Sequence, residues 1–198
     1  MPAEDHNEPT DEVLMLRLRD GDETALVPLM ARWEAPLKRF LYRLLFDPGE
    51  TTDVAQEAFV RLFLQRARFR TDARFAPWLL TIAANLARNR RRWWRRHPTV
   101  SLDEPRERDG GAALAWEPVD ATAGPAERTL AAERAAEVRR AVAALPHELR
   151  EVIVLAEFEE RSHAEIGEIL GCSPKAVEMR LYRARERLRR SLGGLAVR

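Results

Sequence analysis

The sequence concentrates groups that bind nucleic acid in one short stretch. Residues 85–97, NLARNRRRWWRRH, hold six arginines and two tryptophans and no acidic residue. Guanidinium groups donate to phosphates and base edges, and an asparagine amide pairs with a base edge. At helical spacing, Thr81, Asn85, Arg88 and Arg92 share one polar face. We interpret this face as a nucleic-acid contact. A membrane-surface segment and a solvated helix end are the alternatives.

A loop before this helix adds a second kind of contact. Residues 69–74, FRTDAR, mix aromatic, basic and small polar side chains. Such a loop can hold an unstacked base between an aromatic ring and polar groups. The candidate residues are Phe69, Arg70, Thr71, Asp72 and Arg74.

The segment RSHAEIGEILGCSPKAVEMRLYRARERL predicts a helix-turn-helix over residues 161–188. Ser162 and Glu165 fit a capping box, Gly171 supplies a turn, and Ser173 with Pro174 begins the second helix. The outer face of that helix suits the DNA major groove. It carries Lys175, Glu178, Met179, Arg180, Arg183 and Arg187. The alternative is a helical hairpin whose arginines are merely solvated.

A smaller acidic and polar face suits a protein partner. Asp53, Gln56, Glu57 and Val60 fall on one side of a helix whose other side is apolar. A plain solvated face is the alternative interpretation.

The sequence offers no pattern typical of an enzyme. It contains no nucleophile–base set, no metal-ligand spacing and no phosphate-binding glycine loop, so we expect no catalysis, metal or cofactor. The lone cysteine, Cys172, excludes an intramolecular disulfide and fits a reducing cytoplasm; we expect it to fill a turn, not to act in redox chemistry. The first residues are acidic, unlike a signal peptide, and no apolar run could span a bilayer. We therefore expect a cytoplasmic protein that does not bind membranes.

Apolar periodicity predicts the helices that position these groups. They fall at about 23–46, 53–66 (capped by Thr51 or Thr52), 74–94, 127–144, 147–159, 163–170 and 174–190. We expect an all-α fold of two small helical domains, 11–97 and 127–192, after a disordered tail at 1–10. An acidic linker rich in Pro, Gly and Ala, residues 98–126, would join them flexibly. Trp93 is in line with Phe75 and Leu79, so we expect it to close the core, whereas Trp94 lies off that line.

The motifs together resemble one family over most of the chain. The order TDVAQEAFVRLF, RFAPWLLTIAANLARN, a linker, then LPHELREVIVLAEFEERSHAEIGEILGCSPKAVEMRLYRARERL is similar to bacterial RNA polymerase sigma factors. The short length resembles the extracytoplasmic-function (ECF) group, which keeps conserved sigma regions 2 and 4.

The resemblance implies partners and site residues. Asp53, Gln56, Glu57 and Val60 would contact core RNA polymerase, whose β′ and β subunits bind such factors. Asn85 and the loop of residues 69–74 would capture a base of the minus-ten promoter element, supported by Arg88 and Arg92. Ser173, Tyr182 and the helix face defined above would bind the minus-thirty-five element. An anti-sigma factor is a further expected partner.

The resemblance therefore implies a sigma factor that brings core polymerase to promoters and helps open the minus-ten element. The alternative is a helix-turn-helix regulator that acts without polymerase. That alternative leaves the stripe of Asn85, Arg88 and Arg92 unexplained.

Overall fold

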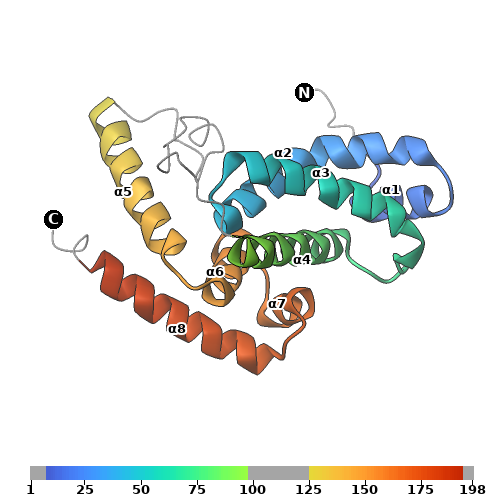
Figure 1. Cartoon of the computed structure of the whole chain (residues 1–198). Coiled ribbons are helices and arrows are strands. Elements are labelled where there is room, and N and C mark those ends of the chain that lie inside the picture. Colours follow the sequence, from blue (N-terminus) through green and yellow to red (C-terminus); the bar gives the residue numbers. More distant parts are fainter. Residues whose placement is uncertain (1–7, 98–124, 194–198) are drawn as a thin grey trace, which may run out of the picture.

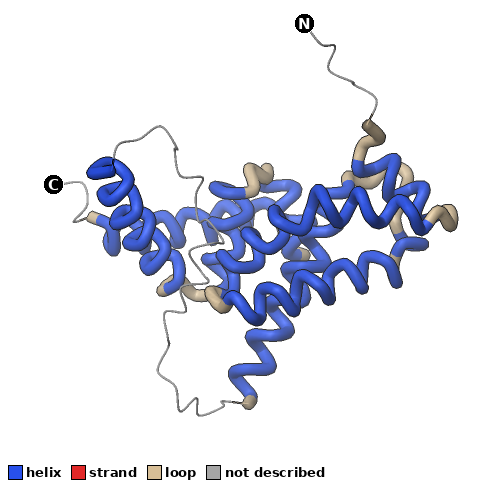
Figure 2. Tube along the Cα trace, turned by 90° about the horizontal axis from the view of Figure 1, so that it is seen from above, coloured by secondary structure: helices blue, strands red, loops and turns tan. Residues whose placement is uncertain are grey.

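In the structure, a computed structural model, the described residues form helices that are joined by short loops within each half of the chain (Figure 1 and Figure 2). It describes residues 8–97 and 125–193, and no strand occurs among these residues. The predicted linker at 98–126 lies, except for its last two residues, outside the described part of the chain. The all-α fold with a helix-turn-helix near the C-terminus is confirmed.

The helices form two halves along the chain. The N-terminal half contains α1 (Asp11–Arg19), η1 (Glu23–Ala25), α2 (Leu26–Leu45), α3 (Pro48–Leu64), η2 (Arg66–Arg68) and α4 (Phe75–Arg96). The C-terminal half contains α5 (Pro125–Ala143), α6 (His147–Ile153), the π-helical stretch η4 (Val154–Phe158), α7 (His163–Leu170) and α8 (Pro174–Leu192).

Local capping decides where α3 begins. The Asp47 carboxylate accepts a hydrogen bond from the Glu50 amide at 2.9 Å, and Pro48 occupies the first turn. The helix therefore starts at Pro48, and a start near residue 53 under a threonine cap is wrong. Thr51 instead lies buried within the first turns, where its hydroxyl donates to the Asp47 carbonyl at 2.6 Å.

The N-terminal half packs α2, α3 and α4 side by side, and α1 packs against α2 and α4 (Figure 1). Phe40, Phe75 and Leu79 are fully buried where α2 meets α4. Polar contacts also hold α1: the Trp33 indole donates to Asp11 at 2.7 Å, the Phe75 amide donates to Glu12 at 3.0 Å, and the Arg32 guanidinium donates to Asp11 at 3.1 Å. The bond to Glu12 fixes the first residue of α4 against α1.

The helix-turn-helix has the predicted caps. Ser162 and Glu165 form the capping box, with the Ser162 amide donating to the Glu165 carboxylate at 2.9 Å. Gly171 ends α7 in the left-handed region at φ 66°, which glycine adopts without steric cost. The Ser173 side chain accepts from the Ala176 amide and begins α8, whose inner face buries Val177, Leu181 and Ala184.

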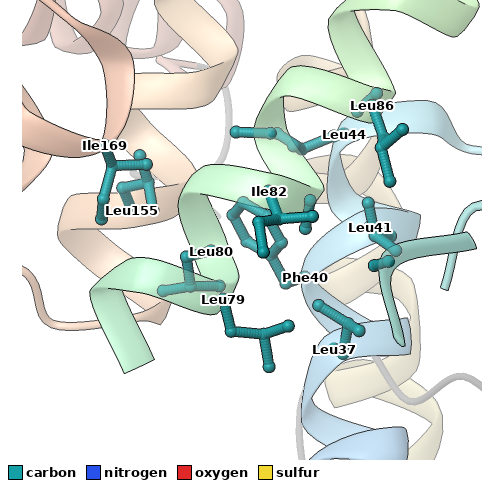
Figure 3. Close-up of a cluster of buried hydrophobic side chains, with 14 of the residues drawn as sticks. Leu37, Phe40, Leu41, Leu44, Leu79, Leu80, Ile82, Leu86, Leu155 and Ile169 are labelled. Atoms are coloured by element: carbon teal, nitrogen blue, oxygen red, sulfur yellow. The ribbon is translucent and has the colours of Figure 1, made fainter. Parts of the chain in front are cut away.

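The two halves share one hydrophobic core. On α4, Leu80, Ala84 and Ala87 are buried along a line beside the line of Phe75 and Leu79. Figure 3 shows Leu155 and Ile169 of the C-terminal half next to Leu80. The helix α4 is thus covered on one side by α2 and α3 and on another by α7, which lies below it in Figure 1.

Candidate nucleic-acid interface

The outer face of α8 is the most open group of predicted contacts. Met179 is 42% exposed and Tyr182 is 64% exposed, and the side chains of Ser173, Lys175, Glu178, Arg183 and Arg187 are also exposed. Arg180 is only half-buried, with its guanidinium 3.8 Å from the Cys172 sulfur. The Lys175 ammonium donates to Glu178 at 2.8 Å and lowers the pKa of that carboxyl. At neutral pH, Glu178 therefore screens one cation of a strongly basic face.

The polar stripe of α4 is divided between solvent and the C-terminal half. Asn85 and Arg92 are exposed, whereas Arg88 is half-buried with its Nε 2.9 Å from the Glu151 carboxylate of α6. Thr81 donates its hydroxyl to the Pro77 carbonyl at 2.8 Å. Asn85 and Arg92 are thus free to meet a ligand in this arrangement, while Arg88 has an acidic partner.

The loop before α4 holds its polar side chains outward and its aromatic ring inward. Arg70 and Asp72 form a two-point ion pair at 2.9 and 2.8 Å, which raises the pKa of Arg70 and lowers that of Asp72. Thr71 is exposed, and Arg74 reaches Glu165 of α7 at 2.5 Å.

Phe69, which the sequence predicts to contact a base, lies in the core. Its ring is 2% exposed and packs edge-on against Trp78 at a centroid distance of 5.3 Å. Phe69 directly follows the 3-10 turn η2 with an extended backbone, and its side chain belongs to the hydrophobic core. The backbone of the loop is anchored by this ring, so its exposed contacts are those of residues 70–72 and Arg74.

The expectation that Trp93 closes the core is also wrong. Trp93 is 49% exposed and stacks on His97, with ring centroids 5.0 Å apart. Trp94 packs against the core and hydrogen-bonds to Glu50 at the start of α3, where Arg90 also pairs with Glu50 at 3.0 Å. Burial is the main reason that the pKa of Glu50 is raised. Because α3 starts early, at Pro48, the Glu50 carboxylate lies next to the last turns of α4. The sequence pattern did not reveal this contact.

The face predicted for a protein partner borders an apolar groove. Asp53, Gln56 and Val60 are exposed on α3, and Glu57 pairs with Arg61 at 3.1 Å. Gln56 and Val60 form one wall of a groove of about 630 Å³ between α2 and α3. Its other lining residues are Glu23, Leu26, Met30, Glu34, Lys38, Ala55, Phe59, Phe63 and Leu64. An apolar floor with charged rims suits an amphipathic helix of another protein.

Sequence reasoning missed the residues that join the halves. Arg150 of α6 is 4% exposed and donates to the Leu44 carbonyl of α2 at 2.7 Å and to the Val142 and Leu145 carbonyls. Arg43 of α2 pairs with Glu159 at 3.4 Å and lies over the Phe158 ring. Burial raises the pKa of Glu159, against the effect of Arg43. The buried line of Leu80, Ala84 and Ala87 on α4 was the available signal that the halves pack together, but it does not point to Arg150 or Arg43.

Within residues 8–97 and 125–193, no group of His, Cys, Asp or Glu side chains is arranged to hold a metal ion. Among the same residues, none of the helices has the length and apolar character required to cross a bilayer.

Comparison with known proteins decides the family. The sigma-70 region 2 model matches residues 29–97, and the sigma-70 region 4 model matches residues 135–188. The chain is 33% identical over 180 residues to the ECF RNA polymerase sigma-E factor of Escherichia coli, covering 89% of this chain and 91% of that relative. The chain belongs to the ECF RNA polymerase sigma factors. It is a transcription initiation factor that directs RNA polymerase to promoters.

Other relatives agree with this placement. This sigma factor is 31% identical to the ECF sigma factor SigW of Bacillus subtilis, over 90% of its own length and 95% of SigW. It is similar in structure to CnrH in complex with the cytosolic domain of CnrY, with a TM-score of 0.67, 26% identity and coverage of 93% and 97%. The fold also resembles RpoE of Bartonella quintana, at a TM-score of 0.59, 21% identity and coverage of 88% and 98%.

Proposed function

We propose that this sigma factor binds both promoter elements through the surfaces described above. Asn85 would pair with a flipped base of the non-template strand at the minus-ten element, with the loop of residues 70–74 around it. Arg88 and Arg92 would hold the adjoining backbone, and the outer face of α8 would enter the major groove at the minus-thirty-five element. The observation that carries this proposal is the exposure of Asn85 and Arg92 on one face of α4, together with the basic face of α8.

We infer that the chemistry is binding without catalysis. An asparagine amide has one acceptor and two donors and can read a base edge, while arginines contribute to affinity through phosphates. The free energy of these contacts would favour the melted strand over the duplex. The reaction itself would be performed by polymerase, with which this sigma factor would act in the cytoplasm.

Polymerase would dock on the exposed face of α3. Asp53 and Gln56 supply acceptors there, and Val60, 56% exposed, adds an apolar contact at the edge of the groove. Such a combination of apolar anchor and polar rim is typical of protein interfaces. Core polymerase would then align the two DNA-binding helices and raise their effective concentration at one promoter.

An anti-sigma factor is the third partner that we propose. CnrH, which is similar over 93% of this chain, is bound to the cytosolic domain of CnrY in its solved structure. The groove between α2 and α3 would allow an inhibitor to compete with polymerase for the same face.

Transcription by purified core RNA polymerase on fragmented genomic DNA tests the proposal. We expect the sigma factor to produce transcripts with defined start sites and Asn85→Ala to reduce them by about tenfold or more, while polymerase binding is retained. Asn89→Ala is the matched control, since Asn89 is an exposed asparagine one turn further along the same helix and is not among the predicted contacts. Equal transcript yields from both variants would remove Asn85 from the site.

A further inference from the structure

The last turns of α4 leave a large aromatic side chain in solvent. Trp93 is 49% exposed, although an indole has one of the largest apolar surfaces that a side chain can bury. The helix continues to Arg96, so Trp93 lies on regular helix and not at a frayed end. Its neighbour Trp94 packs against the core on another side of α4. The Trp93 ring is therefore available to a partner.

His97 covers part of this ring and fixes its orientation. The imidazole stacks on the indole with the ring centroids 5.0 Å apart and the ring planes 24° from parallel. The His97 amide donates to the Trp93 carbonyl at 2.9 Å, and the His97 Nδ1 lies 3.1 Å from the same oxygen. The two rings are thus arranged before any partner arrives, which lowers the entropic cost of adding a third ring to the stack.

Cationic side chains surround the stack. Arg92, Arg95 and Arg96 are exposed, and within the described part of the chain no carboxylate forms an ion pair with any of them. By contrast, Arg88 and Arg90 of the preceding turns each have a carboxylate partner. Three unpaired guanidinium groups around an exposed ring favour a partner that is both anionic and aromatic.

Single-stranded DNA has both properties. Each nucleotide carries a phosphate for a guanidinium and a base whose face can stack on an indole. A base in a duplex already stacks on its neighbours, so the site should favour an unpaired base. A membrane surface suits the site less well, because Leu86 and Ala87 are buried in the core and leave a single ring for lipid.

The stack lies within reach of the strand that we propose to meet Asn85. Asn85 and Trp93 are both exposed and are eight residues apart on α4. A helix rises about 1.5 Å per residue, so their backbones are separated by about 12 Å along the axis. That length corresponds to about three or four nucleotides at roughly 3.4 Å each. One melted strand can therefore contact both residues.

We propose that Trp93, stacked on His97, forms a second base-binding site that takes an unpaired base of the strand read by Asn85. The three arginines around the stack bind the flanking phosphates. The inference rests on the proposed function, because it takes α4 as the surface that meets melted DNA. Stacking tolerates any base, so this site strengthens binding of the open strand while Asn85 supplies the sequence preference.

The test uses the full chain bound to core polymerase. Fluorescence anisotropy measures the affinity of this complex for the labelled non-template strand of a promoter at which the factor starts transcription, with core polymerase alone as the baseline. We expect Trp93→Ala to weaken binding about tenfold, and Trp93→Phe, which keeps a ring, to weaken it by less than about threefold. Leu130→Ala is the matched control, since Leu130 is a comparably exposed apolar residue of α5, at 47%, and should leave the affinity unchanged.

Salt dependence separates stacking from charge. For single strands, each phosphate contact adds about 0.7 to the slope of the logarithm of affinity against the logarithm of salt concentration. We expect Arg96→Gln to reduce this slope by about 0.7 and Trp93→Ala to leave it unchanged. The proposal is overturned if Trp93→Ala binds the strand as the wild type does, or if it weakens binding to the fully paired duplex equally.

Vesicles that contain phosphatidylglycerol test the membrane alternative. We expect the wild-type chain and Trp93→Ala to co-sediment with them to the same small extent. If Trp93→Ala loses vesicle binding and keeps its affinity for the single strand, the ring serves a membrane and the proposal is overturned.

Asn85→Ala separates this proposal from the one on which it rests. If the complex with core polymerase gives no promoter-specific transcripts, the proposed function fails, and the second base site fails with it. If Asn85→Ala reduces affinity for the strand and Trp93→Ala does not, α4 meets melted DNA and only the second base site fails.

Discussion

Replacing Arg150 with methionine should destabilise the fold by about 3 kcal/mol. The guanidinium donates to carbonyls of Leu44, Val142, Ala143 and Leu145, so it joins the end of α2 to the turn between α5 and α6. Hydrogen bonds from a charged donor contribute about 1.5 kcal/mol each at the lower end of their range, or about 6 kcal/mol for the set. A methionine side chain keeps much of the length of the arginine side chain and has no hydrogen-bond donor.

An opposing contribution reduces this loss. Burial, with a smaller contribution from the charge of Arg91, lowers the pKa of Arg150 to about 10, which corresponds to about 3 kcal/mol of cost to the charged form that methionine would relieve. The difference of about 3 kcal/mol is a large fraction of a typical domain stability of about 5–15 kcal/mol.

Urea unfolding followed by circular dichroism measures this loss. Arg134→Met, at an exposed position of α5, serves as the control and should change the free energy of unfolding by less than about 0.5 kcal/mol. If Arg150→Met were as stable as the control, the carbonyl bonds would not contribute as argued.

Three further changes test other parts of the structure. Gly167→Ala should cost about 2 kcal/mol in urea unfolding, because its Cβ would lie 2.7 Å from the Cys172 carbonyl oxygen, whereas Gly49→Ala should be nearly neutral; equal losses would contradict this packing. Glu165→Ala should lower stability by about 1 kcal/mol at pH 7 through loss of the capping box. Hydrogen bonds from Ser162 lower the pKa of Glu165 below 4.5, so this stabilisation is present above that pH and should be lost as pH falls through the depressed pKa; a difference from wild type that persisted at pH 2 would refute the assignment. Val60→Asp should weaken binding to core polymerase about tenfold in a fluorescence titration, and a matched change at exposed Val27 (outside the predicted face) should weaken it less.

Local chemistry explains what the sequence could predict. The capping box at Ser162 and Glu165, the turn at Gly171 and the start of α8 at Ser173 are encoded within a few residues, and all are present. The face of Asp53, Gln56 and Val60 follows from helical spacing, and it is exposed. The roles proposed for these side chains in polymerase and DNA binding stay predictions.

Contacts between segments that are distant in the chain explain which features the sequence could not predict. Trp93 is in line with the apolar residues of α4, yet the helix extends beyond the core at this point and leaves Trp93 exposed. Trp94 and Arg90 instead contact Glu50 of α3. The composition of its loop predicts that Phe69 contacts a base, but in the structure the Phe69 ring packs against Trp78 in the core. The pairing of Arg88 with Glu151 joins residues more than sixty positions apart, which periodicity within one helix does not report.

The central claim is that this sigma factor selects promoters for polymerase through α4 and α8 together. Mapping the 5′ ends of transcripts made by core polymerase and this factor on genomic DNA tests it most directly. We expect the start sites to share one sequence motif near minus ten and another near minus thirty-five, with Asn85→Ala disrupting use of the first and Arg183→Ala of the second. Start sites with no shared motif, or sites unchanged by both substitutions, would contradict the account.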